Sequence, residues 1–457
     1  MAMVVKNNMS ALSTLNTLNR NTTALSKSLQ KVSSGMKINS AADDASGYAI
    51  SERMRVQIRS LDQANSNAQN GGSMMKVAEG AVSSTVEILK TLKEKAVNAA
   101  NDTNTDADRA TIQKELDQSI DQINDNANVT FNGQYLVDGS KNSKTTATTT
   151  VMTNQNLSSE TLSSTGMTDL AARNGDKLNI HSTDTITVSY VQDGKTHTSS
   201  VKLDASEGIA NLTTTNDMTL GKIISYLTEG KVSIGSGVEN GQVITANKGA
   251  SSFIGVDGSG NSVYTASGES GISVASSASG VDNQISGFTI SVTDNTGAVN
   301  KSANAALDAF DEQIRAQNES VDNSIVMQVG TKANQSIKVG LTDMKAQALG
   351  LQGKDGATLS VGNQEKANAA INVLDAAIQK ALDQQTTIGA VESRLEYTQS
   401  NLTTASENVT AAESVIRDAD MAKEMTEYTK IYVLMQAAQS MLAQANQSSS
   451  NALSLLQ

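Results

Sequence analysis

Near the C-terminal end of the chain, an apolar residue recurs at every seventh position. The row consists of Ala367, Leu374, Ala381, Ile388, Leu395, Leu402, Val409 and Ile416. A neighbouring row of small, mostly apolar residues consists of Ala370, Ala377, Gln384, Val391, Thr398, Ala405 and Ala412. An apolar stripe with this spacing, held over about seven heptads, is typical of a coiled-coil helix. The pattern therefore predicts a long helix that needs an equally long partner.

A matching stripe runs from Ile50 to Ala99 in alternating steps of four and three, and only Gln57, Gly71 and Thr85 in it are not apolar. Two unrelated helices of a globular core are the alternative, but such helices average three or four turns. Gly71 and Gly72 together leave open a break into two helices. We predict a rod of paired antiparallel helices whose seam includes Leu61, Met75, Val82, Leu89, Leu92, Leu374, Ile388, Leu395, Leu402, Val409 and Ile416.

Both ends of the chain carry apolar stripes that we expect only another copy of the chain to cover. Residues 1–42 contain no acidic residue and have one thin stripe, and residues 431–457 contain no charged residue at all. Such helices are marginal alone, and apolar surface of this extent is typical of oligomerisation. We expect a coiled coil to form on assembly through Leu15, Leu18, Leu25, Leu29, Val32, Met435, Ala438, Leu442, Ala445, Leu453, Leu455 and Leu456.

The middle of the chain changes composition abruptly. Residues 141–322 are rich in Ser, Thr, Gly and Asn and carry 11 basic and 19 acidic side chains. Alternating runs at Thr185–Val191 and Gly287–Val292 indicate strands of an inserted β-rich module. A β-hairpin is predicted on either side of residues 332–335, because apolar residues alternate at Ile325, Met327 and Val329 and again at Ile337, Val339 and Leu341.

The predicted fold is mainly α, with a hairpin on the helical rod and a β-rich outer module. Its parts are an N-terminal helix (1–42), rod helices (43–140), a β-rich surface insertion (141–322), the hairpin with the second rod helix (323–417), and a C-terminal helix (418–457). The chain of 457 residues contains no proline. Proline kinks helices, so its absence suits long unbroken ones.

Composition excludes several kinds of chemistry. There is no cysteine, so disulfides, thiol nucleophiles and the usual zinc and iron–sulfur sites are ruled out. A metalloprotease needs a His-Glu-x-x-His helix with a third ligand, whereas His181 and His197 are the only histidines. The net charge of −12 argues against nucleic acid. We expect no catalytic, cofactor or metal site, no membrane insertion and no cleaved signal segment.

Three runs of sequence resemble the two ends of bacterial flagellins. They are Ser33–Ile50 (Ser-Ser-Gly-Met-Lys-Ile-Asn-Ser-Ala-Ala-Asp-Asp-Ala-Ser-Gly-Tyr-Ala-Ile), Asn408–Met425 (Asn-Val-Thr-Ala-Ala-Glu-Ser-Val-Ile-Arg-Asp-Ala-Asp-Met-Ala-Lys-Glu-Met) and Leu442–Asn446. The resemblance covers about residues 1–140 and 324–457. It implies a subunit of the extracellular flagellar filament, the helical propeller for motility, in which the terminal helices form the inner core and the insertion projects outward.

The resemblance also implies partners. These are further copies of the chain, an export chaperone at the C-terminal tail, the filament cap and the hook–filament junction proteins, with secretion through the flagellar type III export apparatus. A hook–filament junction protein, which has similar ends, is the alternative function.

A host Toll-like receptor for flagellin is a further implied partner. Flagellins that it detects well carry Gln-Arg-Val-Arg-Glu-Leu-Ala-Val where this chain has the residues from Lys90 to Val97. Thr91 replaces an arginine, and Lys95 replaces a leucine. Losing an arginine anchor and placing a charge in an apolar site both weaken binding. We expect weak recognition through a surface made of Lys90, Thr91, Leu92, Lys93, Glu94, Lys95 and Glu115.

Overall fold

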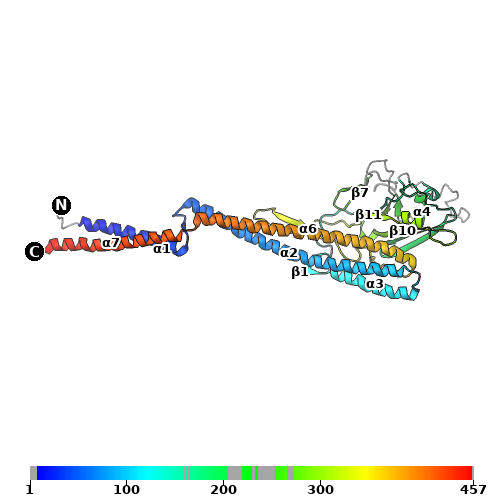
Figure 1. Ribbon diagram of the computed structural model, residues 1–457, viewed down its shortest axis with the longest axis horizontal. Coiled ribbons are helices and arrows are strands. Elements are labelled where there is room, and N and C mark those ends of the chain that lie inside the picture. The colour runs from blue at the N-terminus through cyan, green and yellow to red at the C-terminus, as the bar shows by residue number, and fades with distance from the viewer. Residues whose placement is uncertain are drawn as a thin grey trace. The chain divides into compact units, whose positions relative to one another are not determined.

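A computed structural model describes residues 8–158, 161, 165–203, 219–228, 232–234, 253–264 and 272–454. The chain divides into two compact units. The terminal unit comprises Met1–Gln69, Gln328–Ser336 and Glu396–Gln457, and the central unit comprises Asn70–Met327 and Ile337–Leu395. Long helices and a central β-rich region confirm the predicted fold class (Figure 1). The long helices are α1 (Met9–Ser34), α2 (Ala45–Ala99), α3 (Asp106–Ala127), α6 (Gln364–Arg417) and α7 (Met421–Ser454).

Short polar side chains set the starts of three helices. The Asn8 side chain accepts a hydrogen bond from the Ala11 N–H at the start of α1. Asp44 Oδ1 accepts from the backbone N–H groups of Ser46 and Gly47, each at 3.0 Å, where α2 begins. Thr105 and Asp108 form a reciprocal capping box on α3. Each contact satisfies backbone donors that a helix leaves unpaired in its first turn, so local sequence fixes these boundaries.

Two antiparallel helix pairs make up the terminal unit. In one, Glu52 of α2 contacts Arg417 of α6, and Asp62 of α2 contacts Ser406 of α6. In the other, the side chains of Asn8, Asn21 and Lys31 on α1 reach Ala445, Leu434 and Glu424 on α7, respectively. Because the position on α7 falls as the position on α1 rises, α1 and α7 run in opposite directions.

In the central unit, α2 packs between α3 and α6. Arg109 Nε at the start of α3 donates to the Ala99 carbonyl at the end of α2 over 2.9 Å, and Lys93 on α2 pairs with Asp375 on α6. The large seam residues on both helices are buried here: Met75, Val82, Leu89, Leu92, Leu374, Ile388 and Leu395. In the terminal unit Leu61 and Leu402 are buried, whereas Val409 and Ile416 are half-buried.

Helix α2 continues without a break through Gly71 and Gly72. A Cβ atom at Gly71 would lie 2.4 Å from Met327 Sδ. Met327 belongs to β12 (Ile325–Gln328), which pairs with β13 (Ser336–Val339) as the predicted hairpin. Because Gly71 has no side chain, Met327 of the hairpin can pack directly against α2 at this position. The contact offsets the low helix propensity of glycine.

The β-rich region of the central unit contains two larger sheets. One has the order β10-β4-β5 and the other β11-β3-β9-β6, while β7 and β8 form a separate pair. The strands are β3 (Val151–Asn154), β4 (Thr185–Gln192), β5 (Lys195–Lys202), β6 (Val232–Ile234), β7 (Phe253–Val256), β8 (Ser262–Tyr264), β9 (Ile272–Ser276), β10 (Ile285–Thr293) and β11 (Phe310–Ile314). Short helices α4 (Leu220–Leu227) and α5 (Lys301–Leu307) complete its apolar core, and β1 (Thr130–Phe131) and β2 (Gln134–Tyr135) form a small hairpin after α3.

This region packs directly on α6. Gly287, in a bulge of β10 with a φ of +70°, lies so close to α6 that a Cβ would come 2.7 Å from Val373 Cγ2. The β4–β5 turn at Asp193 and Gly194 lies against the loop at residues 353–357, where Asp193 Oδ1 accepts from the Lys354 N–H. The inserted module thus has close backbone contacts with the helical part of the central unit.

Asp308 lies at the same junction, after α5. Part of the residue reaches solvent, but packing around the carboxyl group raises its pKa to about 6, although the Ile290 N–H and the Asn372 side chain hydrogen-bond to it. A raised aspartate pKa means that the folded state binds its proton more tightly than the unfolded chain does. The contribution of Asp308 to the free energy of unfolding therefore falls as pH rises from about 4 to about 6.

We expect Asp308→Asn to be more stable than wild type at pH 7.5 by roughly 1 kcal/mol, a value reduced for solvent screening, and to match it below pH 4. Urea denaturation of the full chain, followed by circular dichroism across this range, measures the difference. Asp311→Asn, at an exposed position on β11, is the control. A difference that does not vary with pH would contradict the burial argument.

Candidate assembly interface

The paired faces of α1 and α7 hold many of the predicted assembly residues. On α1, Leu18, Leu25 and Val32 are half-buried, as are Met435, Leu442 and Ala445 on α7, where Ala438 is buried. Leu453 lies in α7, and Leu455 and Leu456 lie outside the described residues. All described members of the set therefore lie on one helix pair, and most of them are at least half-buried there.

The same helix pair leaves large apolar side chains in solvent. Leu15 and Leu29 are exposed, Leu29 by 52%, although they share the predicted stripe of α1 with Leu18 and Leu25. One partner helix, α7, covers only one side of that stripe. Further exposed apolar residues on the pair are Met9, Leu12, Met421, Met425, Tyr432, Val433, Leu434 and Met441. An apolar surface of this kind marks an interaction site.

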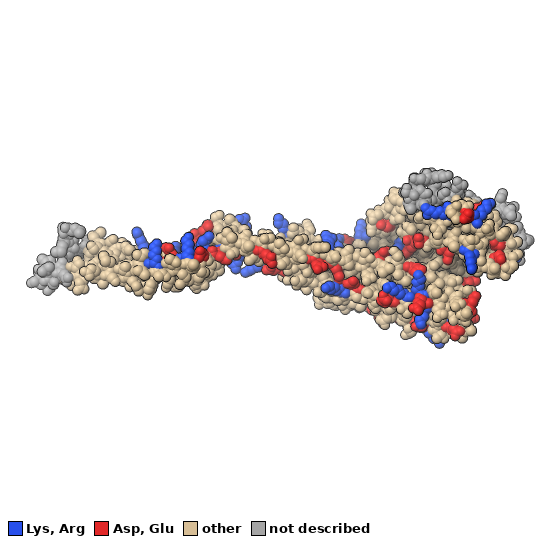
Figure 2. Space-filling view, in the orientation of Figure 1, with Lys and Arg blue, Asp and Glu red and all other residues tan. Residues whose placement is uncertain are grey.

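Charge is distributed unevenly along α1 and α7. Figure 2 shows charged side chains where α1 ends and α7 begins, and none on the visible face toward the chain ends. At the charged end, a groove of about 630 Å³ lies between α1, the connector to α2 and α7. Ser28 faces this groove, and its buried Oγ has no hydrogen-bond partner among the described residues. The groove therefore offers charge, from side chains such as Lys27 and Glu427, to whatever covers it.

Only some of the residues of the predicted receptor surface on α2 are exposed to solvent. Lys90, Thr91 and Glu94 are exposed, but Leu92 is 1% exposed and packs in the seam, so its assignment to the receptor surface was wrong. The seven-residue spacing that makes Leu92 a seam residue turns it away from solvent. Lys95 Nζ pairs with Glu115 of α3 at 3.0 Å. This ion pair depends on how α2 and α3 pack and has no signal in the local sequence.

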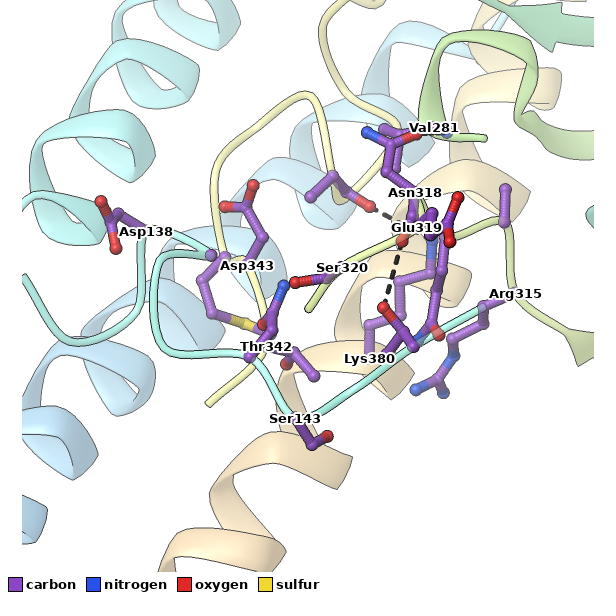
Figure 3. A pocket seen from close by; sticks show the side chains of 17 residues that line it. Asp138, Ser143, Val281, Arg315, Asn318, Glu319, Ser320, Thr342, Asp343 and Lys380 are labelled. Carbon is purple, nitrogen blue, oxygen red and sulfur yellow. Dashed lines mark hydrogen bonds between the residues drawn. The ribbon is translucent and has the colours of Figure 1, made fainter. Parts of the chain in front are cut away.

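A polar cavity of about 300 Å³ in the central unit was not predicted. It lies where the inserted module leaves and rejoins the helices, and Figure 3 shows side chains from several segments around it. Lys380 of α6 reaches it from a buried position, and burial lowers the pKa of its amine. Its Nζ lies 3.8 Å from Glu312 Oε1 and 3.3 Å from the Ala348 carbonyl. Because its lining residues come from segments that are far apart in the sequence, no local sequence motif predicts this cavity.

The two histidines occupy unremarkable positions. His181 has an exposed side chain beside Asp184, and His197 lies in β5, where its ring stacks on Tyr190. In the described part of the chain, no group of three or more His, Cys, Asp or Glu side chains is placed to hold a metal ion. Of the helices described, none has the length and apolar character needed to span a bilayer.

Comparisons with known proteins agree with the architecture. The family described as bacterial flagellin N-terminal helical region matches residues 5–142, and the bacterial flagellin C-terminal helical region matches residues 371–456. A flagellin of Clostridium tyrobutyricum is 33% identical and aligns with 97% of this chain and 99% of its own length. The chain belongs to the bacterial flagellin family.

Other flagellins align along their whole length. Flagellin of Bacillus subtilis (strain 168) is 29% identical over 99% of this chain and 100% of its own, and polar flagellin A of Vibrio parahaemolyticus is 30% identical over 100% of both. Among solved structures, the flagellar junction protein FlgL of Legionella pneumophila shares 14% identity, covers 80% of this chain and 99% of its own, and has a TM-score of 0.31.

The Lys380–Glu312 pair gives a test of how this flagellin holds its insertion. Lys380→Met should destabilise the fold by about 2–4 kcal/mol, because it leaves the buried Glu312 carboxylate without its partner on α6. Adding Glu312→Gln should restore part of the loss, since the carboxylate that had lost the Lys380 amine is then neutral, while its other ion pair, with Arg315 at 3.7 Å, is lost as well. Denaturant unfolding of the full chain measures both effects.

The matched control is Lys354→Met, which removes an exposed ion pair with Asp282. We expect it to change the free energy of unfolding by less than about 1 kcal/mol. Equal losses for Lys354→Met and Lys380→Met would contradict a special role for the buried pair.

Proposed function

We propose that this flagellin is a structural subunit that self-assembles into the flagellar filament, the helical propeller for motility. The observation that carries the proposal is the exposed apolar surface of α1 and α7, which another copy of the same chain would cover. Flagellins aligned over nearly the whole chain support it. Each large apolar side chain buried in such a contact contributes roughly 1.5–3 kcal/mol.

The domain roles follow from this proposal. The terminal helices (1–42 and 418–457) form the inner core, the segments at 43–140 and 323–417 form the outer core, and the insertion at 141–322 lies on the filament surface. We assign no catalytic role, because flagellins form a structural family. The alternative, a hook–filament junction protein, would be present in few copies, so copy number in isolated filaments separates the two.

Export and partners belong to the same proposal. The filament is extracellular, and we infer that the chain leaves the cell through the flagellar type III apparatus. An export chaperone would cover the uncharged apolar tail until then, because the exposed side chains of α7 would otherwise promote association in the cell. At the growing filament, the cap and the junction proteins are the further contacts.

Seeded polymerisation tests the assembly surface directly. Met441→Asp places a charge on a side chain that is 62% exposed in the single chain. We expect it to prevent filament growth while the helicity of the monomer changes little, because the charge is desolvated only in the assembly. Met441→Leu keeps the apolar character and should polymerise. Electron microscopy after seeding is the measurement, and growth of the aspartate variant at the wild-type rate would contradict the proposal.

Receptor recognition is proposed to be weak. Thr91 offers no guanidinium, and its hydroxyl bonds to the Glu87 carbonyl, while the Lys95 amine is held by Glu115. A receptor that needs an apolar residue at position 95 would have to break that ion pair. Both features act against binding at a surface where Lys93, Glu94 and Glu115 still match well-detected flagellins in type.

We expect Thr91→Arg combined with Lys95→Leu to raise the affinity of the monomer for the receptor ectodomain about a hundredfold. Surface plasmon resonance with monomeric proteins measures the change. Asn98→Arg, which adds a positive charge at another exposed position of α2, controls for non-specific attraction. Equal affinities of the wild type and the double variant would refute this explanation.

A further inference from the structure

Arg417, the last residue of α6, is buried although it carries a charge. Its side chain is 8% exposed and reaches Met36 in the connector between α1 and α2 as well as residues in the first turns of α2. Nη1 donates to Glu52 Oε1 at 2.7 Å and lies 3.4 Å from Ser51 Oγ, and Nε lies 3.0 Å from Met36 Sδ. The guanidinium also lies over the ring of Tyr48, 5.6 Å from its centroid.

The backbone joins the two connectors at the same place. The Lys37 N–H donates to the Arg417 carbonyl at 2.7 Å, and the Ala419 N–H donates to the Gly35 carbonyl at 2.9 Å. Met36 and Asp418 form an isolated antiparallel bridge. The chain leaving α1 and the chain entering α7 are therefore hydrogen-bonded to each other beside the Arg417 side chain.

The geometry requires arginine rather than any cation. A guanidinium is planar and has five donors in a fixed fork, so it can bond to Glu52 and Met36 while its face lies on Tyr48. A lysine amine places its three donors on one atom and cannot make these contacts together. The hydrogen bond from Arg417 is also the main cause that holds the pKa of Glu52 below its usual range.

We propose that Arg417 is a positioning residue for filament assembly, which fixes both connectors together and so sets α1 and α7 in the arrangement that other subunits bind. This inference rests on the proposed filament function. Arg417 itself is covered by its own chain and acts through the two helices. Without it, the connectors have more conformations, and each subunit that joins the filament loses that additional entropy.

The test compares the full-length wild type with Arg417→Lys, Arg417→Ala and Glu52→Gln in seeded polymerisation. Losing a charge-assisted network of this kind should raise the critical concentration about tenfold or more for Arg417→Lys. Arg53→Lys, at an exposed arginine in the third turn of α2, is the matched control and should polymerise as wild type does. Combining Arg417→Lys with Glu52→Gln should cost less than the product of the two single effects.

Amide exchange of the monomers separates positioning from general stability. We expect Arg417→Lys to lose protection in α1 and α7 together, with unchanged protection in residues 70–99 and 364–395. A wild-type critical concentration for Arg417→Lys, or an equal loss of protection in those α2 and α6 segments, would overturn the inference. If Arg417→Ala does not fold, Arg417→Lys and Glu52→Gln still test the positioning role of Arg417. Failure of the wild type to polymerise would instead count against the filament function.

Discussion

Burial of one continuous apolar seam is the interaction on which the helical structure depends. In the central unit, the seam side chains of α2 and α6 are fully covered within the chain, and helices as long as these gain most of their stability from such packing rather than from propensity. In α1 and α7 the same type of stripe continues, but each helix has one partner and the outer apolar residues stay in solvent. The seam of α2 and α6 is covered within the chain and stabilises its fold. The stripes of α1 and α7 are only partly covered, so their exposed residues remain available for assembly.

Heptad periodicity predicted the long helices and the seam because their packing repeats over many turns, so single exceptions such as Gly71 do not hide it. The hairpin at residues 325–339 was also predictable, since one face of each strand is apolar. On α1 the stripe was identified, but which side α7 covers was not. Leu18 and Leu29 have the same character in the sequence, and only the position of α7 makes one half-buried and the other exposed.

Contacts between distant segments could not be predicted from the sequence, for a different reason. The pairs Lys95–Glu115 and Lys380–Glu312 depend on the register between elements, which a charge pattern along one segment does not contain. Gly287 looked like part of an ordinary strand, yet it is the point at which β10 touches α6. Such contacts also connect the insertion to the helices of the central unit. Buried charge and close backbone packing at its base mean that its removal would expose Val373 and leave Lys380 without Glu312, even though the seam lies outside it.

The polar composition of the terminal helices is compatible with burial in an assembly. Several of their threonine hydroxyl groups are already paired within each helix: Thr14, Thr17 and Thr22 on α1 donate to the carbonyl four residues back, and Thr426 and Thr429 on α7 do the same. A hydroxyl satisfied in this way can be taken out of water at little cost, whereas an unpaired one would oppose assembly by about 1–3 kcal/mol. Back-bonding of this kind also slightly destabilises and bends a helix. The same residues therefore keep α1 and α7 marginal as separate helices and make their surfaces inexpensive to desolvate, which is the combination that a subunit polymerising through its ends requires.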